Sequence, residues 1–164
     1  MELFSGDAAI TRSFQYNNLR ACPIDVAYDA AFDLASTTGF CLAVTLVLRL
    51  CPCVGLLWLA PVCTTFVFLA SSKHRRCPAL PLGDFNRPDV HLGNVLANRS
   101  IALIALCDSM RIHWALEQSS NSVMGHLKRF QQRWRCRPKV WTRIYQLGHF
   151  GAPNRKPVKT TCIC

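Results

Sequence analysis

The stretch LCPCVGLLWLAPVCTTFVFLASSKHRRC (residues 50–77) is typical of either a membrane span or a buried core, and the predicted fold class depends on which of the two it forms. Residues 50–72 carry no charged side chain, and the cations Lys73, Arg75 and Arg76 follow at once. A helix needs about 20 predominantly apolar residues to cross ~30 Å of hydrocarbon. An amphipathic core helix requires a polar face, and this stretch has none. The sequence therefore predicts a transmembrane helix over about residues 50–72.

The shape of this membrane region has an alternative. Pro61 would kink the helix, which membrane helices tolerate better than soluble ones. Residues 34–48 are also uncharged, so a helical hairpin is open. That arm is short for a full crossing, and we expect it to lie in the interface or to re-enter. Val, Thr, Phe and Cys also favour strands, which leaves open a buried helix or a pair of buried strands in a soluble protein.

The charges are divided unevenly along the chain. Residues 1–72 hold five acids and three bases, whereas residues 73–164 hold four acids and sixteen bases, and no acid follows Glu117. Positive flanks of membrane spans stay in the cytosol. We therefore expect a membrane location with residues 73–164 cytosolic. Membrane lipids and an acidic protein or lipid surface are the expected partners.

The predicted fold class is mainly α, an integral membrane protein with one kinked span followed by a basic, amphipathic helical region. The segments are an acidic start (1–33), the membrane region (34–72), a basic and Pro-rich linker (73–88), a helical region (89–147) and a disordered basic tail (148–164). The helical region rests on apolar residues at spacings of three, four and seven, which are Leu92, Leu96, Leu103, Cys107, Met110 and Trp114, then Val123, Leu127, Phe130 and Trp134.

The candidate binding segment spans residues 126–143. It combines seven cations with three aromatic side chains: Lys128, Arg129, Arg133, Arg135, Arg137, Lys139 and Arg143, with Phe130, Trp134 and Trp141. An interfacial helix uses this combination on anionic lipid, and a single-stranded nucleic-acid site uses it for stacking and phosphate contact. A third interpretation is a solvated basic helix that packs through its apolar side. We expect lipid before nucleic acid, because the predicted span places the segment near a membrane.

The ten cysteines indicate lipidation more than metal binding. No pair has the spacing of a zinc site, and no metal site is predicted. Cys77 follows the basic flank, where S-palmitoylation is typical. The ending Cys162-Ile163-Cys164 resembles the doubly prenylated CxC ending of Rab-type small GTPases, over those three residues alone. The chain lacks the GxxxxGK[ST] loop of a GTPase, which favours a frayed tail ending in two thiols.

No catalytic motif is readable, so the sequence predicts a non-enzymatic protein without cofactors. The expected function is a small membrane-anchored accessory protein whose basic face contacts anionic lipid or an acidic partner. Arg outnumbers Lys fourteen to five, a bias that would suit a viral accessory protein. The first alternative is a nucleic-acid-binding accessory protein that uses the same basic face. The second is a soluble α-helical protein whose core is formed by residues 40–70.

Overall fold

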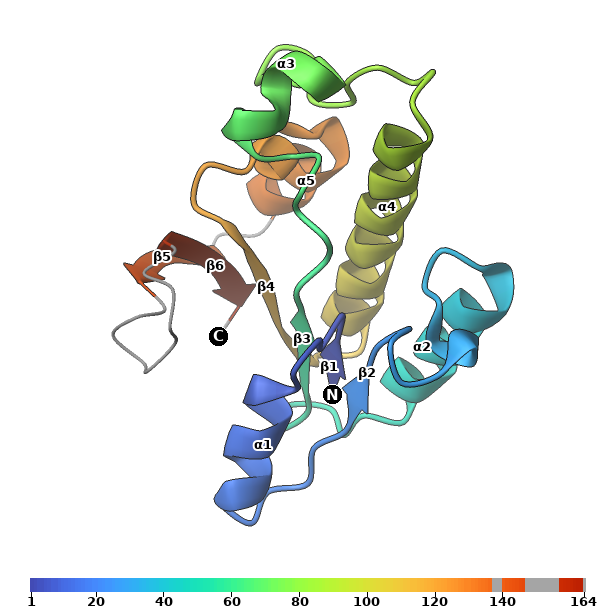
Figure 1. Cartoon of the computed structure of the whole chain (residues 1–164). Helices are drawn as coiled ribbons and strands as arrows, with labels where there is room; N and C mark the ends of the chain where they lie inside the picture. Colours follow the sequence, from blue (N-terminus) through green and yellow to red (C-terminus); the bar gives the residue numbers. More distant parts are fainter. Residues whose placement is uncertain (137–139, 147–156, 164) are drawn as a thin grey trace.

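The protein has an α/β fold with a six-stranded mixed sheet in the order β2-β1-β3-β4-β6-β5. The computed structural model describes residues 1–136, 140–146 and 157–163. The strands are β1 (Glu2–Leu3), β2 (Pro23–Ile24), β3 (Leu56–Leu59), β4 (His113–Ser119), β5 (Val140–Gln146) and β6 (Pro157–Ile163). The first four in this order are parallel, and β6 runs antiparallel to both β4 and β5 (Figure 1).

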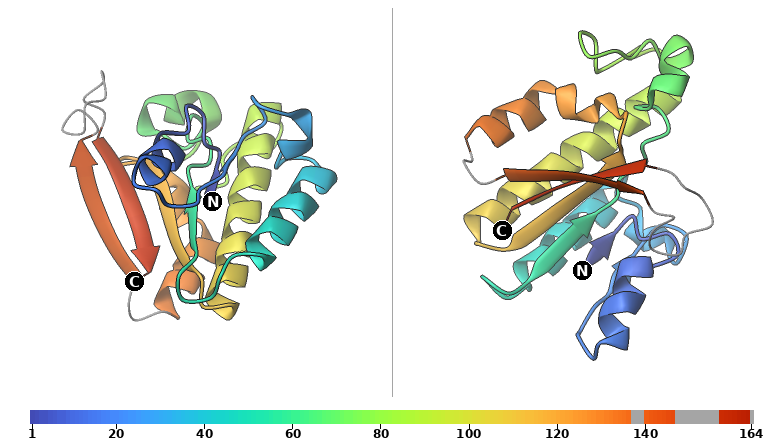
Figure 2. Two further views of the ribbon diagram at one scale, coloured as in Figure 1. Left: turned by 90° about the horizontal axis from the view of Figure 1, so that it is seen from below. Right: turned by 90° about the vertical axis from the view of Figure 1, so that its left-hand side faces the viewer.

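Helices lie on both sides of the parallel strands. They are α1 (Ala9–Tyr16), α2 (Thr37–Leu48), α3 (Ser71–His74), α4 (Pro88–Ser109) and α5 (Lys128–Arg135), with the 3-10 turns η1 (Ala30–Phe32), η2 (Phe68–Ala70) and η3 (Val123–His126). Helices α2 and α4 lie on one side of the strands and α1 on the other (Figure 2). Helix α4 makes the crossover that two parallel neighbours such as β3 and β4 require.

The predicted transmembrane helix at residues 50–72 is wrong, and with it the mainly α, single-pass fold. This stretch forms strand β3, turns and η2. Its side chains at Leu57, Leu59 and Phe66 are fully buried in the protein's own core. A parallel strand covered on both faces reads as a continuous apolar run, which is why the stretch imitated a span.

One helix among the described residues, α4, is long and apolar enough to cross a membrane by length and composition. Its most apolar 18-residue window is 56% buried within the protein, and a core helix passes the same test. Val90, Ala97 and Leu103 of α4 have no exposed surface. The membrane location expected from the 50–72 span loses that support and stays a prediction.

Strands also occupy parts of the chain that we expected to be helical or disordered. β4 follows α4 directly, and β5 and β6 form an antiparallel pair at the edge of the sheet. β5 has the sequence VWTRIYQ, in which β-branched and aromatic residues, the best strand formers, are frequent. The helical spacing of the sequence matches α4 and α5 but not the residues between them.

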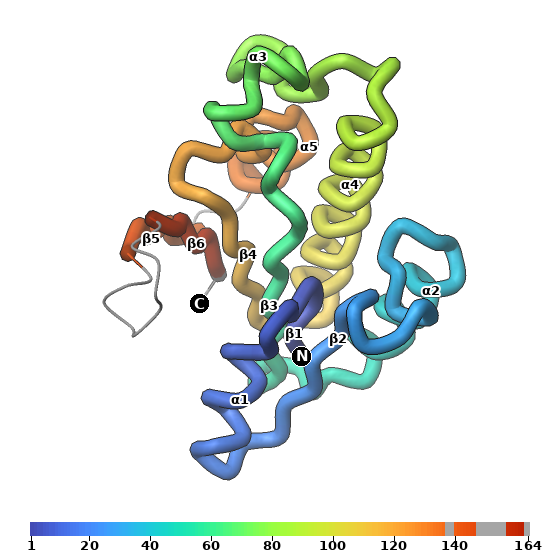
Figure 3. The backbone as a smooth tube through the Cα atoms, viewed as in Figure 1, coloured from blue at the N-terminus to red at the C-terminus, as the bar shows by residue number. Residues whose placement is uncertain are grey.

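The order of the parallel strands changes direction at β1. The chain places β2 on one side of β1 and then β3 on the other, so the loops that leave β1 and β3 separate. In Figure 3 the chain leaves β1 toward α1 and leaves β3 toward α3. In open α/β sheets, ligands bind outside the carboxyl ends of the strands at such a switch point. We therefore expect a ligand site in the loops after β1, β2 and β3.

Candidate functional site

The loop after β1 has an unusual backbone. Residues 4–8 (FSGDA) join β1 to α1, and Phe4, Gly6 and Ala8 have φ angles of 59°, 48° and 52°. The left-handed region is easy for glycine but strained for Phe4 and Ala8, at a cost of about 1–3 kcal/mol each. Strained backbone of this kind persists only where the surrounding structure holds it, and it clusters at ligand sites.

Asp25, directly after β2, holds this loop. Its Oδ2 accepts a hydrogen bond from the backbone N–H of Gly6 at 2.9 Å, and its Oδ1 accepts one from the N–H of Ala27 at 2.9 Å. The hydroxyl of Tyr28 donates to the carbonyl oxygen of Gly6. The loops after β1 and β2 are thereby joined into one surface at the carboxyl edge of the sheet.

Glu2 fixes the other end of the same loop. Its side chain is buried, and its Oε2 accepts the backbone N–H of Thr11 at 2.7 Å. Ala8 precedes α1 and supplies no capping side chain, so the first turn of this helix lacks a local partner. The carboxylate of Glu2 takes that role from the neighbouring strand and holds α1 against the sheet.

The loop after β1 is open to solvent at Gly6 and has a hydroxyl at Ser5 that is unpartnered within the described residues. Gly6 is exposed, and a Cβ added to it would meet nothing within 4 Å. The hydroxyl of Ser5 is buried and has no hydrogen-bond partner in the part of the chain that the structure describes. Val26 and Tyr28 are 58% and 50% exposed, so apolar surface flanks Asp25. These features suit a ligand with one flat apolar part and several hydroxyl groups.

Acidic side chains are frequent in the loops at this edge, and the guanidinium of Arg99 donates to the carbonyl oxygens of Leu34 and Ser36 beside them. Residues 1–8 and 25–36 contain no Lys or Arg and hold five carboxylates: Glu2, Asp7, Asp25, Asp29 and Asp33. Dinucleotide-binding loops use the pattern GxGxxG and place a pyrophosphate at the helix N-terminus. Here Gly6 is the loop's one glycine, and Asp7 would repel a phosphate. The edge therefore favours a neutral or cationic ligand over a phosphorylated one.

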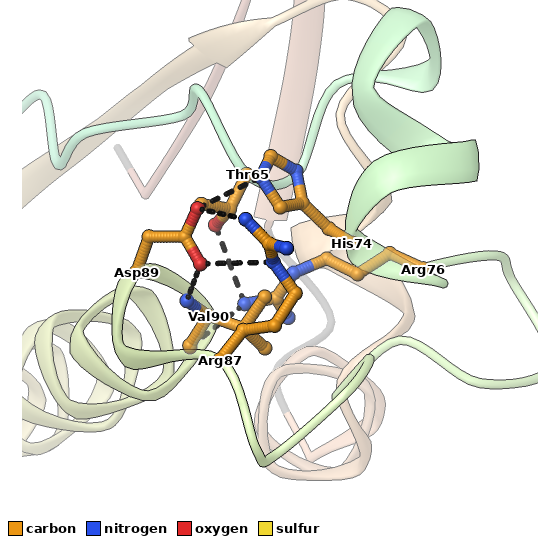
Figure 4. Close-up of polar contacts among 6 residues, drawn as sticks. All are labelled: Thr65, His74, Arg76, Arg87, Asp89 and Val90. Carbon is orange, nitrogen blue, oxygen red and sulfur yellow. Dashed lines mark hydrogen bonds and ion pairs between the residues drawn. The ribbon is translucent and has the colours of Figure 1, made fainter.

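A second polar cluster lies at the start of α4 (Figure 4). Arg76 is buried, and its guanidinium donates to Asn94 Oδ1 at 2.9 Å, to the Val90 carbonyl at 3.0 Å and to Thr65 Oγ1 at 3.3 Å. It also lies 3.8 Å from the ring centroid of Phe66. Burial lowers the pKa of Arg76 to about 10, which still leaves it charged at neutral pH.

His74 and Asp89 complete this cluster. His74 Nε2 lies 3.1 Å from Asp89 Oδ2, and Arg87 Nη2 lies 3.1 Å from the same oxygen. The hydrogen bond from Arg87 is the main reason that the pKa of Asp89 falls to about 2. The cluster ties the segment between β3 and α4 to the first turns of α4. We assign it a structural role, because the hydrogen bonds of Arg76 and the contacts of Asp89 all join parts of the fold to one another.

The predicted membrane flank is therefore divided. Lys73 and Arg75 are exposed, whereas Arg76 is 1% exposed and makes the contacts above. A cation that is enclosed by hydrogen-bond acceptors cannot meet lipid headgroups. Only Lys73 and Arg75 keep the surface position that the prediction required.

The predicted basic aromatic segment is split between α5 and β5. In α5, Lys128, Arg129 and Arg135 are exposed, whereas Arg133 pairs with Asp108 at 2.7 Å. The aromatic rings of this helix turn inward. Phe130 is buried, and its ring centroid lies 5.5 Å from that of half-buried Trp134.

The remaining members of that segment lie elsewhere. Trp141 and Arg143 are exposed on the edge strand β5. Arg137 and Lys139 lie outside the described residues. The exposed cations of the predicted segment therefore lie on α5, whereas Trp141 and Arg143 lie on β5. The segment does not form one continuous face.

The predicted lipidation cysteines have different environments. Cys77 is exposed, and its sulfur accepts the N–H of Leu80 at 3.3 Å. Cys162 is half-buried within β6, where it is paired in register with Ala115 and Trp141. Cys164 lies outside the described residues. Across the described ranges, no three His, Cys, Asp or Glu side chains form a group that could hold a metal ion.

Sequence reasoning missed the loop at residues 4–8 and its partner Asp25. The available signal was a short apolar strand, a Gly-Asp pair and an aspartate 19 residues after Gly6. The apolar run at residues 50–72 obscured it, because a strand of two residues has no periodicity to detect. Comparisons with protein-family models, with curated proteins and with solved structures found no match for this chain.

Proposed function

We propose that this protein binds a nucleoside cofactor without phosphate groups at the carboxyl ends of β1 and β2. The observation that carries the proposal is the hydrogen bond between Asp25 and the N–H of Gly6, at the carboxyl ends of two parallel strands and beside the switch point of the sheet. It joins the two loops that a nucleoside contacts in folds of this architecture.

The ribose would be recognised by Asp25. In doubly wound sheets an acidic residue about 20 positions after the first loop accepts hydrogen bonds from ribose hydroxyls. Each carboxylate oxygen has two lone-pair directions, so Asp25 can hold both backbone N–H groups and still accept from a ligand. The exposed side chains of Val26 and Tyr28 supply apolar surface beside it for the base.

The charge of the edge selects among nucleosides. The loops at residues 4–8 and 25–33 contain no Lys or Arg and hold Asp7, Asp25, Asp29 and Asp33, which disfavour ATP and NAD, because these bring phosphates, and favour a ligand that bears positive charge. S-adenosylmethionine is a nucleoside of that kind, with a sulfonium and an ammonium group. The corresponding activity class is methyl transfer. This proposal departs from the non-enzymatic role expected from the sequence, which stays a prediction based on absent motifs.

Calorimetric titration of the full chain tests the proposal. We expect binding of S-adenosylmethionine and of S-adenosylhomocysteine, which share adenosine and an amino-acid group. ATP and NAD should bind at least about tenfold more weakly, because each phosphate meets an acidic surface. Equal or tighter binding of ATP or NAD would contradict the charge argument, and no binding of either adenosyl compound would contradict the site.

Contact with a polyanion is the second candidate function. Lys128, Arg129 and Arg135 favour this function, because they are exposed on α5. They belong to the part of the sequence after Glu117, which contains no Asp or Glu. Binding of the full chain to single-stranded DNA or to phosphatidylserine vesicles should weaken steeply as salt is raised. Binding that persists unchanged at high salt would contradict an electrostatic contact. The inward position of Phe130 argues against base stacking on that ring.

A further inference from the structure

A groove of about 670 Å³ lies between the segment that precedes α4 and the start of α5. Its lining comes from residues 78–82, Phe85, Asn94, Asn98 and residues 126–131. None of these belongs to the loops after β1 and β2, so the groove is separate from the proposed nucleoside site. Its volume lies in the range of ~300–1,000 Å³ that is typical of small-molecule sites.

One wall of the groove is apolar and exposed. Leu80, Leu82 and Phe85 are 51%, 39% and 60% exposed, although all three side chains are apolar. The backbone behind them is held, because Asn94 donates to the Leu82 carbonyl at 2.9 Å and Arg76 donates to the Pro81 carbonyl. The Arg76 cluster therefore presents this wall in a fixed position, which lowers the ordering cost of binding.

The opposite wall is cationic. His126, Lys128 and Arg129 are exposed there, and the lining of the groove includes no Asp or Glu. No side chain caps the N-terminus of α5, so its first backbone N–H groups add partial positive charge to the same wall. Asn98, whose Oδ1 accepts from Arg129 at 3.3 Å, holds one of these cations beside α4.

We propose that this groove binds a small organic anion with an aromatic or acyl body, such as a phosphate monoester. The anionic group contacts Lys128 and Arg129 at the start of α5. The apolar body packs on Phe85 and its neighbours. Neither wall alone explains the groove, because a purely apolar ligand leaves the cations unused and a purely inorganic anion leaves the apolar wall exposed.

Titration of the full chain with 1-naphthyl phosphate, 1-naphthol and inorganic phosphate tests both parts of the proposal. We expect naphthyl phosphate to bind at least about tenfold more tightly than either half, since a tenfold change needs only about 1.4 kcal/mol. If 1-naphthol or inorganic phosphate binds as tightly as naphthyl phosphate, or if naphthyl phosphate does not bind, the proposal is wrong.

Variants locate the binding. Phe85→Ala and the pair Lys128→Gln with Arg129→Gln should each weaken naphthyl phosphate at least fivefold. Arg135→Gln is the matched control, because Arg135 is an exposed cation of the same helix that does not line the groove. Should the double variant fail to fold, Lys128→Gln alone is measured. An equal loss with Arg135→Gln would place the binding on the general basic surface and overturn the proposal.

Discussion

The carboxylate of Asp25 accepts the backbone N–H of Gly6 at 2.9 Å and thereby joins the ends of two neighbouring parallel strands. Gly6 has a φ of 48°, and the residues on either side of its loop, Phe4 and Ala8, are also left-handed. The contact therefore stabilises a backbone that would not hold this conformation by itself. It is also the contact on which the proposed cofactor site depends.

Replacement of Asp25 tests this dependence. Asp25→Ala removes the acceptor for two backbone N–H groups and for the ribose hydroxyls. Hydrogen bonds to charged groups contribute about 1.5–3 kcal/mol, so we expect binding of S-adenosylmethionine to weaken ~10–100-fold in a calorimetric titration. Asp84→Ala is the control, because Asp84 accepts an N–H from Asn86 in a surface turn away from this edge. Unchanged affinity of the Asp25 variant would remove Asp25 from the site.

The thiol of Cys63 offers a reporter for the same edge. Cys63 is half-buried in the loop after β3, and Gln118 holds that loop by donating to the Pro61 carbonyl at 2.8 Å. β3 pairs in parallel with β1, so the loop after β3 leaves the sheet at the same edge as residues 4–8, and a ligand at that edge should shield Cys63 from iodoacetamide. We expect S-adenosylmethionine to slow its alkylation severalfold, measured by peptide mass spectrometry.

Two other thiols are controls for this labelling. Cys22 and Cys53 are exposed and precede β2 and β3, so they lie at the amino end of the sheet. Their alkylation should be unaffected by the ligand. Equal protection of all three cysteines would indicate a general stabilisation of the chain in place of a ligand at the carboxyl edge.

Arg76 should contribute strongly to stability. Arg76→Ala removes the donor to Asn94 Oδ1 and to the Pro81 carbonyl and opens a cavity beside Phe66. Unsatisfied buried groups and cavities together suggest a loss of about 3–5 kcal/mol in the free energy of unfolding by urea. The neighbouring exposed Arg75→Ala should change it by less than ~0.5 kcal/mol. Similar effects of the two variants would contradict the burial of Arg76.

Asp89 should make stability depend on acidity. Its pKa is lowered from 3.8 to about 2 in the folded protein, chiefly by the hydrogen bond from Arg87. A carboxylate with a depressed pKa stabilises the fold above its unfolded pKa, and this contribution is lost as the pH falls toward the folded value. We expect the midpoint of urea unfolding to drop between about pH 5 and pH 2, and to drop less in Asp89→Asn. A pH dependence unchanged by this substitution would refute the linkage.

The sequence predicted some helices well, but it offered strands only as an alternative for residues 50–72, for definite physical reasons. The spacing of Leu96, Leu103 and Cys107 matches the buried side of α4, because a long helix repeats its buried positions many times, whereas Leu92 of the same predicted pattern is 46% exposed. β1 and β2 have two residues each, which no periodicity can reveal. For β3, Gly55 and Pro61 on either side were the usable signal, since such residues bound strands and interrupt helices.

The residues of the candidate sites also differ in whether the sequence could predict their position. Three cations of the predicted binding segment, Lys128, Arg129 and Arg135, are exposed on α5, and their role in binding stays a prediction. The burial of Arg76 and Phe130 depends on tertiary packing, such as the hydrogen bond from Arg76 to Asn94 of α4, which the sequence does not reveal locally. The loop at residues 4–8 becomes a candidate only when the strand order places Asp25 beside it.

Hydrogen exchange of the full chain with and without S-adenosylmethionine shows where the ligand binds. We expect slower exchange of the amides in residues 4–8 and 25–33, where the ligand and Asp25 hold the two loops. Residues 71–76 around α3 should not change, because the Arg76 cluster belongs to the fold and not to the site. Unaltered exchange in both loops at saturating ligand, or protection confined to another part of the chain, would contradict a nucleoside site at the carboxyl ends of β1 and β2.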